Sequence, residues 1–256
     1  MEVLHLETLL AAVVFVGARV AGVMTFAPFL SSDSIALPVK AGFTLVLTAL
    51  LYPVAGVLGL RVDALGWVRV ALGEFALGLL LGGTVQFFFD AVEAAGQIVG
   101  VQIGFSLITI LDPQTQADTP VLSTFHQLVA LLIFLRLNVH HWILRGLAAS
   151  FADLPPGRVL AGRAVSAALW HTAASIWVVG LEIAGPVVAA TLITDVALGF
   201  LGKASPQLPV VFIGLSVKNL LGLVVLAGSM TFWPRLFERH FMSALMLSER
   251  LLHLAR

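Results

Sequence analysis

The segment LGKASPQLPVVFIGLSVKNLLGL, Leu201–Leu223, decides how the rest of this sequence is interpreted. It is apolar enough to lie in a lipid bilayer, yet it carries Lys203 and Lys218. The sequence PQLP at Pro206–Pro209 interrupts it, and proline disrupts the interior of a helix because it has no backbone N–H. The segment therefore predicts two apolar helices joined by a break, with lysines that need partners other than lipid.

The composition of the whole chain has the same character. Of its 256 residues, 59% are hydrophobic and 11% are charged, and the mean hydropathy is +1.03. Soluble domains carry about 25% charged residues. This length has room for roughly six membrane-crossing helices of about 20 residues each. The sequence therefore predicts an all-α membrane protein.

Apolar runs with helical periodicity divide the chain, and polar or proline-rich sequences separate them. The runs cover Thr8–Leu30, Ala41–Leu60, Val70–Phe89, Ala94–Leu111, Val121–Leu144, Ala164–Phe200 and Val210–Trp233. After them, Arg235–Arg256 mixes charged and apolar residues at helical spacing, which predicts an amphipathic helix at the membrane surface.

Several classes of function are disfavoured. Lys plus Arg and Asp plus Glu both number 14, so no basic field attracts nucleic acid. The chain has no cysteine for disulfides or thiolate metal sites. Met1–Leu10 contains two glutamates and no Lys or Arg, which argues against a cleaved signal peptide.

No catalytic motif of a serine hydrolase, a zinc protease, a P-loop NTPase or a dinucleotide-binding enzyme occurs. The adjacent His140 and His141 diverge by about 100° on a helix, so they cannot chelate one ion together. Asp90 and Glu93 lie one helical turn apart and are interpreted as the edge of a hydrated loop. We therefore expect no enzyme activity, no cofactor and no metal.

Six charged residues that interrupt or flank the apolar runs carry the functional signal. They are Arg19, Glu74, Glu182, Asp195, Lys203 and Lys218. Each would cost roughly 3 kcal/mol at the centre of a bilayer, so together they must face protein or water. Two explanations remain open from the residues alone: an ion-coupled transporter with charges along its pathway, or a subunit whose neighbours satisfy the charges.

Two further segments have distinctive patterns. In AGQIVGVQIG, Gly96, Gly100 and Gly104 recur every four residues, which favours close packing of one helix face against another backbone. The polar, proline-containing loop Leu111–Leu122 connects two apolar runs. By composition alone, that loop is interpreted as an ordinary turn at the membrane surface.

Taken in order, these features resemble the FliR family of bacterial flagellar export proteins, called SctT in injectisomes. The resemblance extends from about Leu9 to Phe241. It depends on the order and spacing of Arg19, Gly22, Pro28, Pro38, Gly73, Glu74, Gly104, Asp112, Pro113, His140, Ser150, Phe151, Pro155, Pro186, Pro206, Gln207 and Lys218. Pro209 departs from the pattern, because many relatives have Asn there, and this departure concerns only the local loop geometry.

The resemblance implies a subunit of the type III secretion export gate, in the bacterial inner membrane within the flagellar basal body. Its partners would be FliP and FliQ homologues, an FlhB homologue and the unfolded exported proteins. The expected fold is a set of bent helical hairpins within a helical, conical gate. Residues 1–163 would be FliP-like, and residues 164–256 would contain a FliQ-like hairpin followed by the amphipathic helix.

The resemblance also implies roles for particular residues. A loop at about 106–120 would plug the closed channel, with Ser106, Leu107, Ile108, Thr109, Ile110, Leu111, Asp112, Pro113, Gln114, Thr115 and Gln116 as its candidate residues. Subunit contacts or structural charges would be Arg19, Glu74, Asp195, Lys203 and Lys218. Helix packing would involve Gly96, Gly100 and Gly104, and the helix break would comprise Pro206, Gln207 and Pro209. The alternative is a proton- or ion-coupled secondary transporter with Glu74, Glu182 and Asp195 as relay groups.

Overall fold

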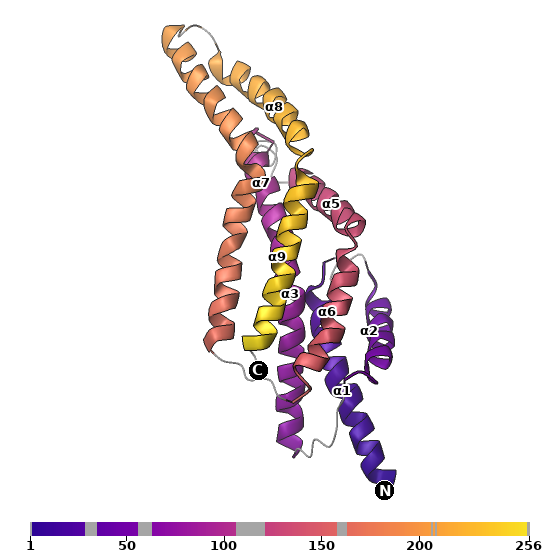
Figure 1. Cartoon of the computed structure of the whole chain (residues 1–256). Helices are drawn as coiled ribbons and strands as arrows, with labels where there is room; N and C mark the ends of the chain where they lie inside the picture. The colour runs from indigo at the N-terminus through magenta and orange to yellow at the C-terminus, as the bar shows by residue number, and fades with distance from the viewer. Residues whose placement is uncertain are drawn as a thin grey trace. The chain divides into compact units, whose positions relative to one another are not determined.

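The computed structural model describes residues 2–28, 35–55, 63–105, 121–157, 163–205, 207 and 209–254. All regular structure in these ranges is α-helical (Figure 1). The helices are α1 (Glu2–Phe26), α2 (Leu37–Leu51), α3 (Ala64–Gln102), α5 (Val121–Arg136), α6 (Val139–Asp153), α7 (Arg163–Ala204), α8 (Val210–Ser229) and α9 (Trp233–Leu254). The predicted all-α architecture is confirmed.

Within the described ranges, three helices are long and apolar enough to cross a membrane, and α5 with α6 could form a fourth, broken span. The three are Leu65–Gln102, Ala173–Ala204 and Phe212–Ser229. Roughly six spans were predicted. The apolar part of α1, Leu10–Phe26, and the helix α2 are each shorter than the roughly 20 residues that a bilayer requires.

Two helix boundaries differ from the sequence-based predictions. The runs Val70–Phe89 and Ala94–Leu111 were predicted as separate segments, but α3 continues through Asp90 and Glu93, so the hydrated loop edge expected there is wrong. Glu93 is accommodated in the helix because it accepts hydrogen bonds from the side-chain amides of Gln97 at 3.3 Å and Gln127 at 2.7 Å. A glutamate with amide donors on its own helix and on α5 does not need a loop.

The run Val121–Leu144, predicted as one segment, is divided into α5 and α6. The division lies at Leu137 and Asn138. Asn138 has a φ of 54°, in the left-handed region that asparagine tolerates better than most residues. A single residue in this conformation ends one helix and lets the next begin in a different direction.

The chain forms two compact units that each draw on separate parts of the sequence. Unit 1 comprises Met1–Phe88, Leu135–Ala173 and His240–Arg256, and unit 2 comprises Phe89–Phe134 and Ala174–Arg239. These two units are defined by contacts in space. The predicted division after residue 163 is of another kind, because it separates a FliP-like part from a FliQ-like part by resemblance, and it stays a prediction.

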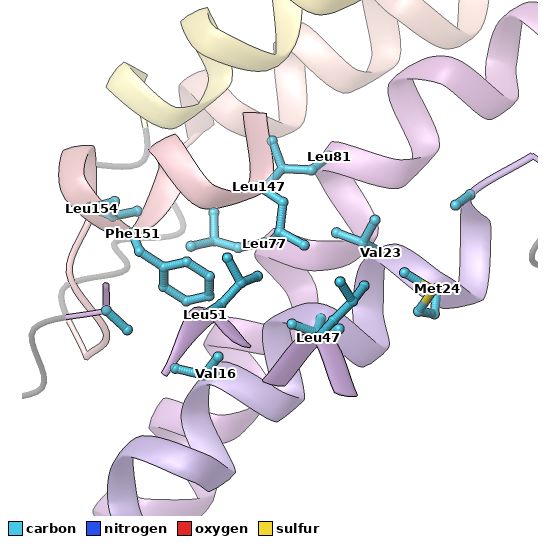
Figure 2. Packing of buried hydrophobic residues seen from close by; sticks show 13 residues of the cluster. Val16, Val23, Met24, Leu47, Leu51, Leu77, Leu81, Leu147, Phe151 and Leu154 are labelled. Carbon is cyan, nitrogen blue, oxygen red and sulfur yellow. The ribbon is translucent and has the colours of Figure 1, made fainter. Parts of the chain in front are cut away.

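The core of unit 1 brings together α1, α2, α3 and α6. Figure 2 shows Val16, Val23 and Met24 of α1 beside Leu47 and Leu51 of α2, Leu77 and Leu81 of α3, and Leu147 and Phe151 of α6. All of these side chains are buried. Van der Waals contacts among these side chains hold the four helices of unit 1 together.

Glycines allow α1 and α3 to approach closely inside this core. A Cβ atom placed on Gly22 would lie 2.9 Å from the Cα of Gly78 and against the carbonyl oxygen of Phe75. A Cβ atom on Gly78 would lie 2.9 Å from the Cα of Gly22. Backbone atoms cannot yield as a flexible side chain can, so each helix needs glycine where they cross.

In unit 2, the three glycines at spacing four have different surroundings. A Cβ atom on Gly96 would lie 2.5 Å from the Cα of Ser123, which places α5 directly against α3. Gly104 has a φ of 90° and is the second residue after the end of α3. The N–H of Phe105 donates to the carbonyl of Gly100 at 2.9 Å, and that of Gly104 to the carbonyl of Val101 at 3.1 Å. These bonds form the turn that typically ends a helix at a left-handed glycine.

Candidate assembly interface

The interior of unit 1 contains an ion pair. Arg19 of α1 and Glu74 of α3 are both 0% exposed, and Nη2 of Arg19 lies 2.6 Å from Oε2 of Glu74. Nε of Arg19 donates to the same carboxylate oxygen at 2.7 Å. A buried charge is tolerated only when it is paired and its remaining hydrogen-bonding groups are satisfied.

The rest of the guanidinium is satisfied by the end of α6. Nη1 donates to the carbonyl and the hydroxyl of Ser150 at 2.9 and 3.0 Å, and Nη2 donates to the carbonyl of Leu154 at 2.9 Å. The N–H of Gly157 donates to Oε1 of Glu74 at 2.9 Å. The carbon of the guanidinium also lies 4.3 Å from the ring centroid of Phe151, a favourable cation–π distance. Arg19 therefore fixes the C-terminal end of α6 to α1 and α3.

The hairpin of α7 and α8 in unit 2 has a different kind of charge pair. Nζ of Lys218 on α8 lies 2.8 Å from Oδ2 of Asp195 on α7. The two side chains are 19% and 45% exposed, so this pair lies at the surface of the hairpin. Lys203, at the end of α7, is exposed as well.

The break between α7 and α8 coincides with the proline-containing sequence. α7 ends at Ala204 and α8 begins at Val210 (Figure 1). Gln207 lies exposed in a turn, and Pro209 precedes the first residue of α8 with φ −75° and ψ 64°. Pro206 lies outside the described residues. Proline immediately before a helix fits the rule that its missing N–H is harmless there.

Large apolar side chains cover the outside of this hairpin. The apolar span of α7 is 28% buried and that of α8 is 17% buried, compared with 61% for the span of α3. Ile193, Phe200, Phe212 and Leu220 are each at least 70% exposed. An exposed apolar surface of this extent requires lipid or protein against it. We call the exposed faces of α7 from Leu192 to Leu201 and of α8 from Phe212 to Val224 the hairpin face.

The plug residues predicted from the resemblance, Ser106–Gln116, lie outside the described residues. The proposed relay groups are not close enough for a continuous relay along α7, because Glu182 and Asp195 are separated by about 20 Å of helix at 1.5 Å per residue. Asp195 is paired with Lys218, and Glu74 with Arg19. No group of three His, Cys, Asp or Glu side chains suited to a metal occurs among the described residues.

One polar site in unit 2 was not predicted. His126 of α5 is buried, its Nδ1 lies 2.7 Å from the carbonyl oxygen of Leu122, and its ring centroid lies 5.0 Å from that of Trp233. Ser123, one turn earlier, is also buried. The spacing of Ser123 and His126 places both on one face of the helix. This shared face was the only feature of the sequence that could have indicated the buried polar site.

The chain is similar in sequence to known bacterial export proteins over most of its length. The family model described as "Bacterial export proteins, family 1" matches residues 10–244. The "Flagellar biosynthetic protein FliR" of Escherichia coli is 32% identical over 212 residues, covering 83% of this chain and 81% of the relative. The proteins of the same name from Pectobacterium carotovorum and Bacillus subtilis are 27% and 30% identical, covering 87% and 64% of this chain and 85% and 65% of the respective relatives.

Proposed function

This chain belongs to the bacterial export proteins of family 1, in the FliR group, and we propose that it is a structural and gating subunit of the flagellar type III export gate. In this role it forms part of the channel entrance for unfolded flagellar proteins, in the bacterial inner membrane. It performs no chemistry itself, and other components supply the energy for export.

The hairpin face is the single observation that supports assembly most strongly. Phe200 and Phe212 are 73% and 77% exposed in the chain alone, although both are aromatic. The neighbouring Asp195–Lys218 pair adds charge to the same hairpin. A surface that alternates large apolar groups with a charge pair fits a protein neighbour better than lipid, because lipid tails cannot satisfy a partly exposed ion pair.

The partners proposed for this face are FliP and FliQ homologues, with an FlhB homologue in contact with the assembly. The relatives' name, flagellar biosynthetic protein, supports a place in the flagellar system. Under this proposal, the residues Ser106–Gln116 form the plug of the closed channel. Arg19 and Glu74 are structural charges, since their partners lie in this chain.

Co-purification tests the assembly directly. The tagged chain is co-expressed with the FliP and FliQ homologues of the same genome, purified through its tag and examined by native mass spectrometry. A discrete complex with all three components is the expected result. A monomer or homo-oligomer that retains neither partner would contradict the proposal and would favour the alternative, a proton- or ion-coupled transporter, to be tested by proton flux in Glu74, Glu182 and Asp195 variants.

A paired substitution locates the contact. Ile193→Ser together with Phe212→Ser should abolish co-purification while the chain remains folded, because both side chains are exposed and neither contributes to a core. Leu37→Ser together with Val39→Ser is the matched control, since these residues of α2 are 78% and 62% exposed but lie outside the hairpin face. Equal loss of partners in both double variants would contradict a specific role for the hairpin.

A further inference from the structure

A cavity of about 320 Å³ lies where α8 meets α9, and all of its lining residues belong to unit 2. The lining residues come from α7, the end of α8, its connection to α9 and the first two turns of α9. They are Glu182, Ile183, Pro186, Ser229, Phe232, Trp233, Arg235, Leu236 and Arg239. The volume lies in the range of pockets that bind small molecules.

The lining is divided between an apolar floor and a charged rim. Ile183 and Trp233 are 1% and 2% exposed, so they form the floor, while Phe232 is 69% exposed at the edge. Arg235, Arg239 and Glu182 are exposed around the opening. A ligand that fits must therefore have an apolar part and an anionic part.

The positions of the two arginines favour one phosphate group. Arg235 and Arg239 are four residues apart on α9, so their side chains emerge from the same face, one turn apart. Arg239 and Glu182 each have an interaction partner within the chain, which restrains them at the rim. The three rim charges sum to +1, which matches the single negative charge of a phosphodiester.

The hydroxyl group in the lining does not compete for this role. The hydroxyl of Ser229 donates to the carbonyl of Leu226 at 2.8 Å. The hydrogen-bond donors at the opening are therefore the guanidinium groups. Guanidinium groups bind phosphate oxygens with two parallel N–H donors, which gives both strength and orientation.

The sequence changes character at the cavity. The apolar span Phe212–Ser229 ends there, and α9, with its mixed charged and apolar sequence, begins. Aromatic residues such as Phe232 and Trp233, together with basic residues, are typical of protein segments that contact lipid head groups. Basic pockets between helices bind the head groups of anionic lipids.

We infer that this cavity binds an anionic phospholipid, with its phosphodiester between Arg235 and Arg239 and its glycerol and first acyl carbons over Ile183, Pro186 and Phe232. The inference does not depend on the proposed function. It assigns the junction of α8 and α9 a ligand in addition to any protein partner.

Native mass spectrometry of the delipidated full chain in detergent tests this assignment. Phosphatidylglycerol and phosphatidylcholine with identical acyl chains are titrated separately. Phosphatidylglycerol should bind about fivefold more tightly, the difference expected for one arginine acting on one net negative charge near the surface. Arg235→Gln and Arg239→Gln should each remove this preference.

Arg136→Gln is the matched control, because it removes the same charge from an exposed arginine that does not line the cavity. It should keep the preference. Phe232→Ala, which removes an exposed aromatic side chain at the edge of the cavity, should weaken the binding of both lipids equally. Equal binding of the two lipids by the unaltered chain, or an equal effect of Arg136→Gln, would overturn the inference.

Two further outcomes identify other occupants. Displacement of the lipid by inorganic phosphate at millimolar concentration would assign the site to a free anion and would overturn the phospholipid assignment. The titration is repeated on the complex with co-purified partners. Loss of the lipid site there would show that protein covers the cavity, which would also overturn the inference, while the proposed function would stand.

Discussion

The Arg19–Glu74 pair of unit 1 and the Asp195–Lys218 pair of unit 2 use the same chemistry for different purposes. The first is 0% exposed and its hydrogen-bonding groups have partners on α6, whereas the second is partly exposed on a hairpin with an apolar outer face. A buried pair determines which segments of one chain lie together. A surface pair contributes little to the packing of the chain's own segments. Its remaining hydrogen-bonding groups can instead contact a neighbouring protein.

Removing half of the buried pair should have the largest effect. Glu74→Gln leaves the Arg19 guanidinium buried without a counter-charge, which costs about 3–5 kcal/mol. We expect a large loss of folded protein and a lower midpoint of thermal unfolding in detergent. The double variant Arg19→Met with Glu74→Leu should lose less, because no charge remains buried, and an unchanged midpoint for Glu74→Gln would contradict a structural role for the pair.

Glycine substitutions should show an intermediate effect that also differs between the two units. Gly78→Ala places a Cβ atom against the backbone of α1, and overpacking of this kind costs about 1–3 kcal/mol. In Gly214→Ala in α8, the added Cβ atom would lie 2.8 Å from Cδ1 of Leu198. This atom is the end of a flexible side chain, which can rotate away. Thermal unfolding should therefore separate the two variants.

Gly83→Ala is the baseline for these measurements, since nothing lies within 4 Å of its added Cβ atom. It should be neutral or stabilising by up to about 1 kcal/mol, the difference in helix propensity between the two residues. Equal destabilisation by Gly78→Ala and Gly83→Ala would show that α1 and α3 do not cross closely.

Removing the surface pair should have the smallest effect on the chain itself. Lys218→Met should change the free energy of unfolding by less than about 1 kcal/mol, as is usual for partly exposed ion pairs. Its effect should appear instead as weaker co-purification with the partners. If Lys218→Met destabilised the isolated chain as strongly as Glu74→Gln, the distinction between the two pairs would be wrong.

The sequence predicted the helical membrane architecture because apolar periodicity and helix-breaking residues are local signals. It also predicted that Arg19 and Glu74 require polar surroundings, since the cost of a charge in lipid depends on the residue alone. It did not identify their partners. Glu74 is 55 residues from Arg19, and Ser150 is 131 residues away, so only the packing of three helices brings them together.

Other differences have similar causes. Their spacing predicted a common packing face for Gly96, Gly100 and Gly104, but Gly104 lies beyond the end of α3, where the chain turns. Helix ends depend on a few backbone hydrogen bonds that spacing does not reveal. In the same way, Asn138 divides one apolar run into α5 and α6 without any proline or glycine beside it.

The most direct test of the account measures whether partners cover the hairpin face. The chain has no cysteine, so Phe212→Cys introduces a single thiol at a position that is 77% exposed. Val92→Cys, which is 0% exposed, is the buried control, and the denatured chain gives full labelling. We predict that maleimide labels the introduced thiol faster in the isolated chain in detergent than in the complex with the FliP and FliQ homologues. Equal labelling rates in the isolated chain and in the complex would contradict the assignment of the hairpin to assembly.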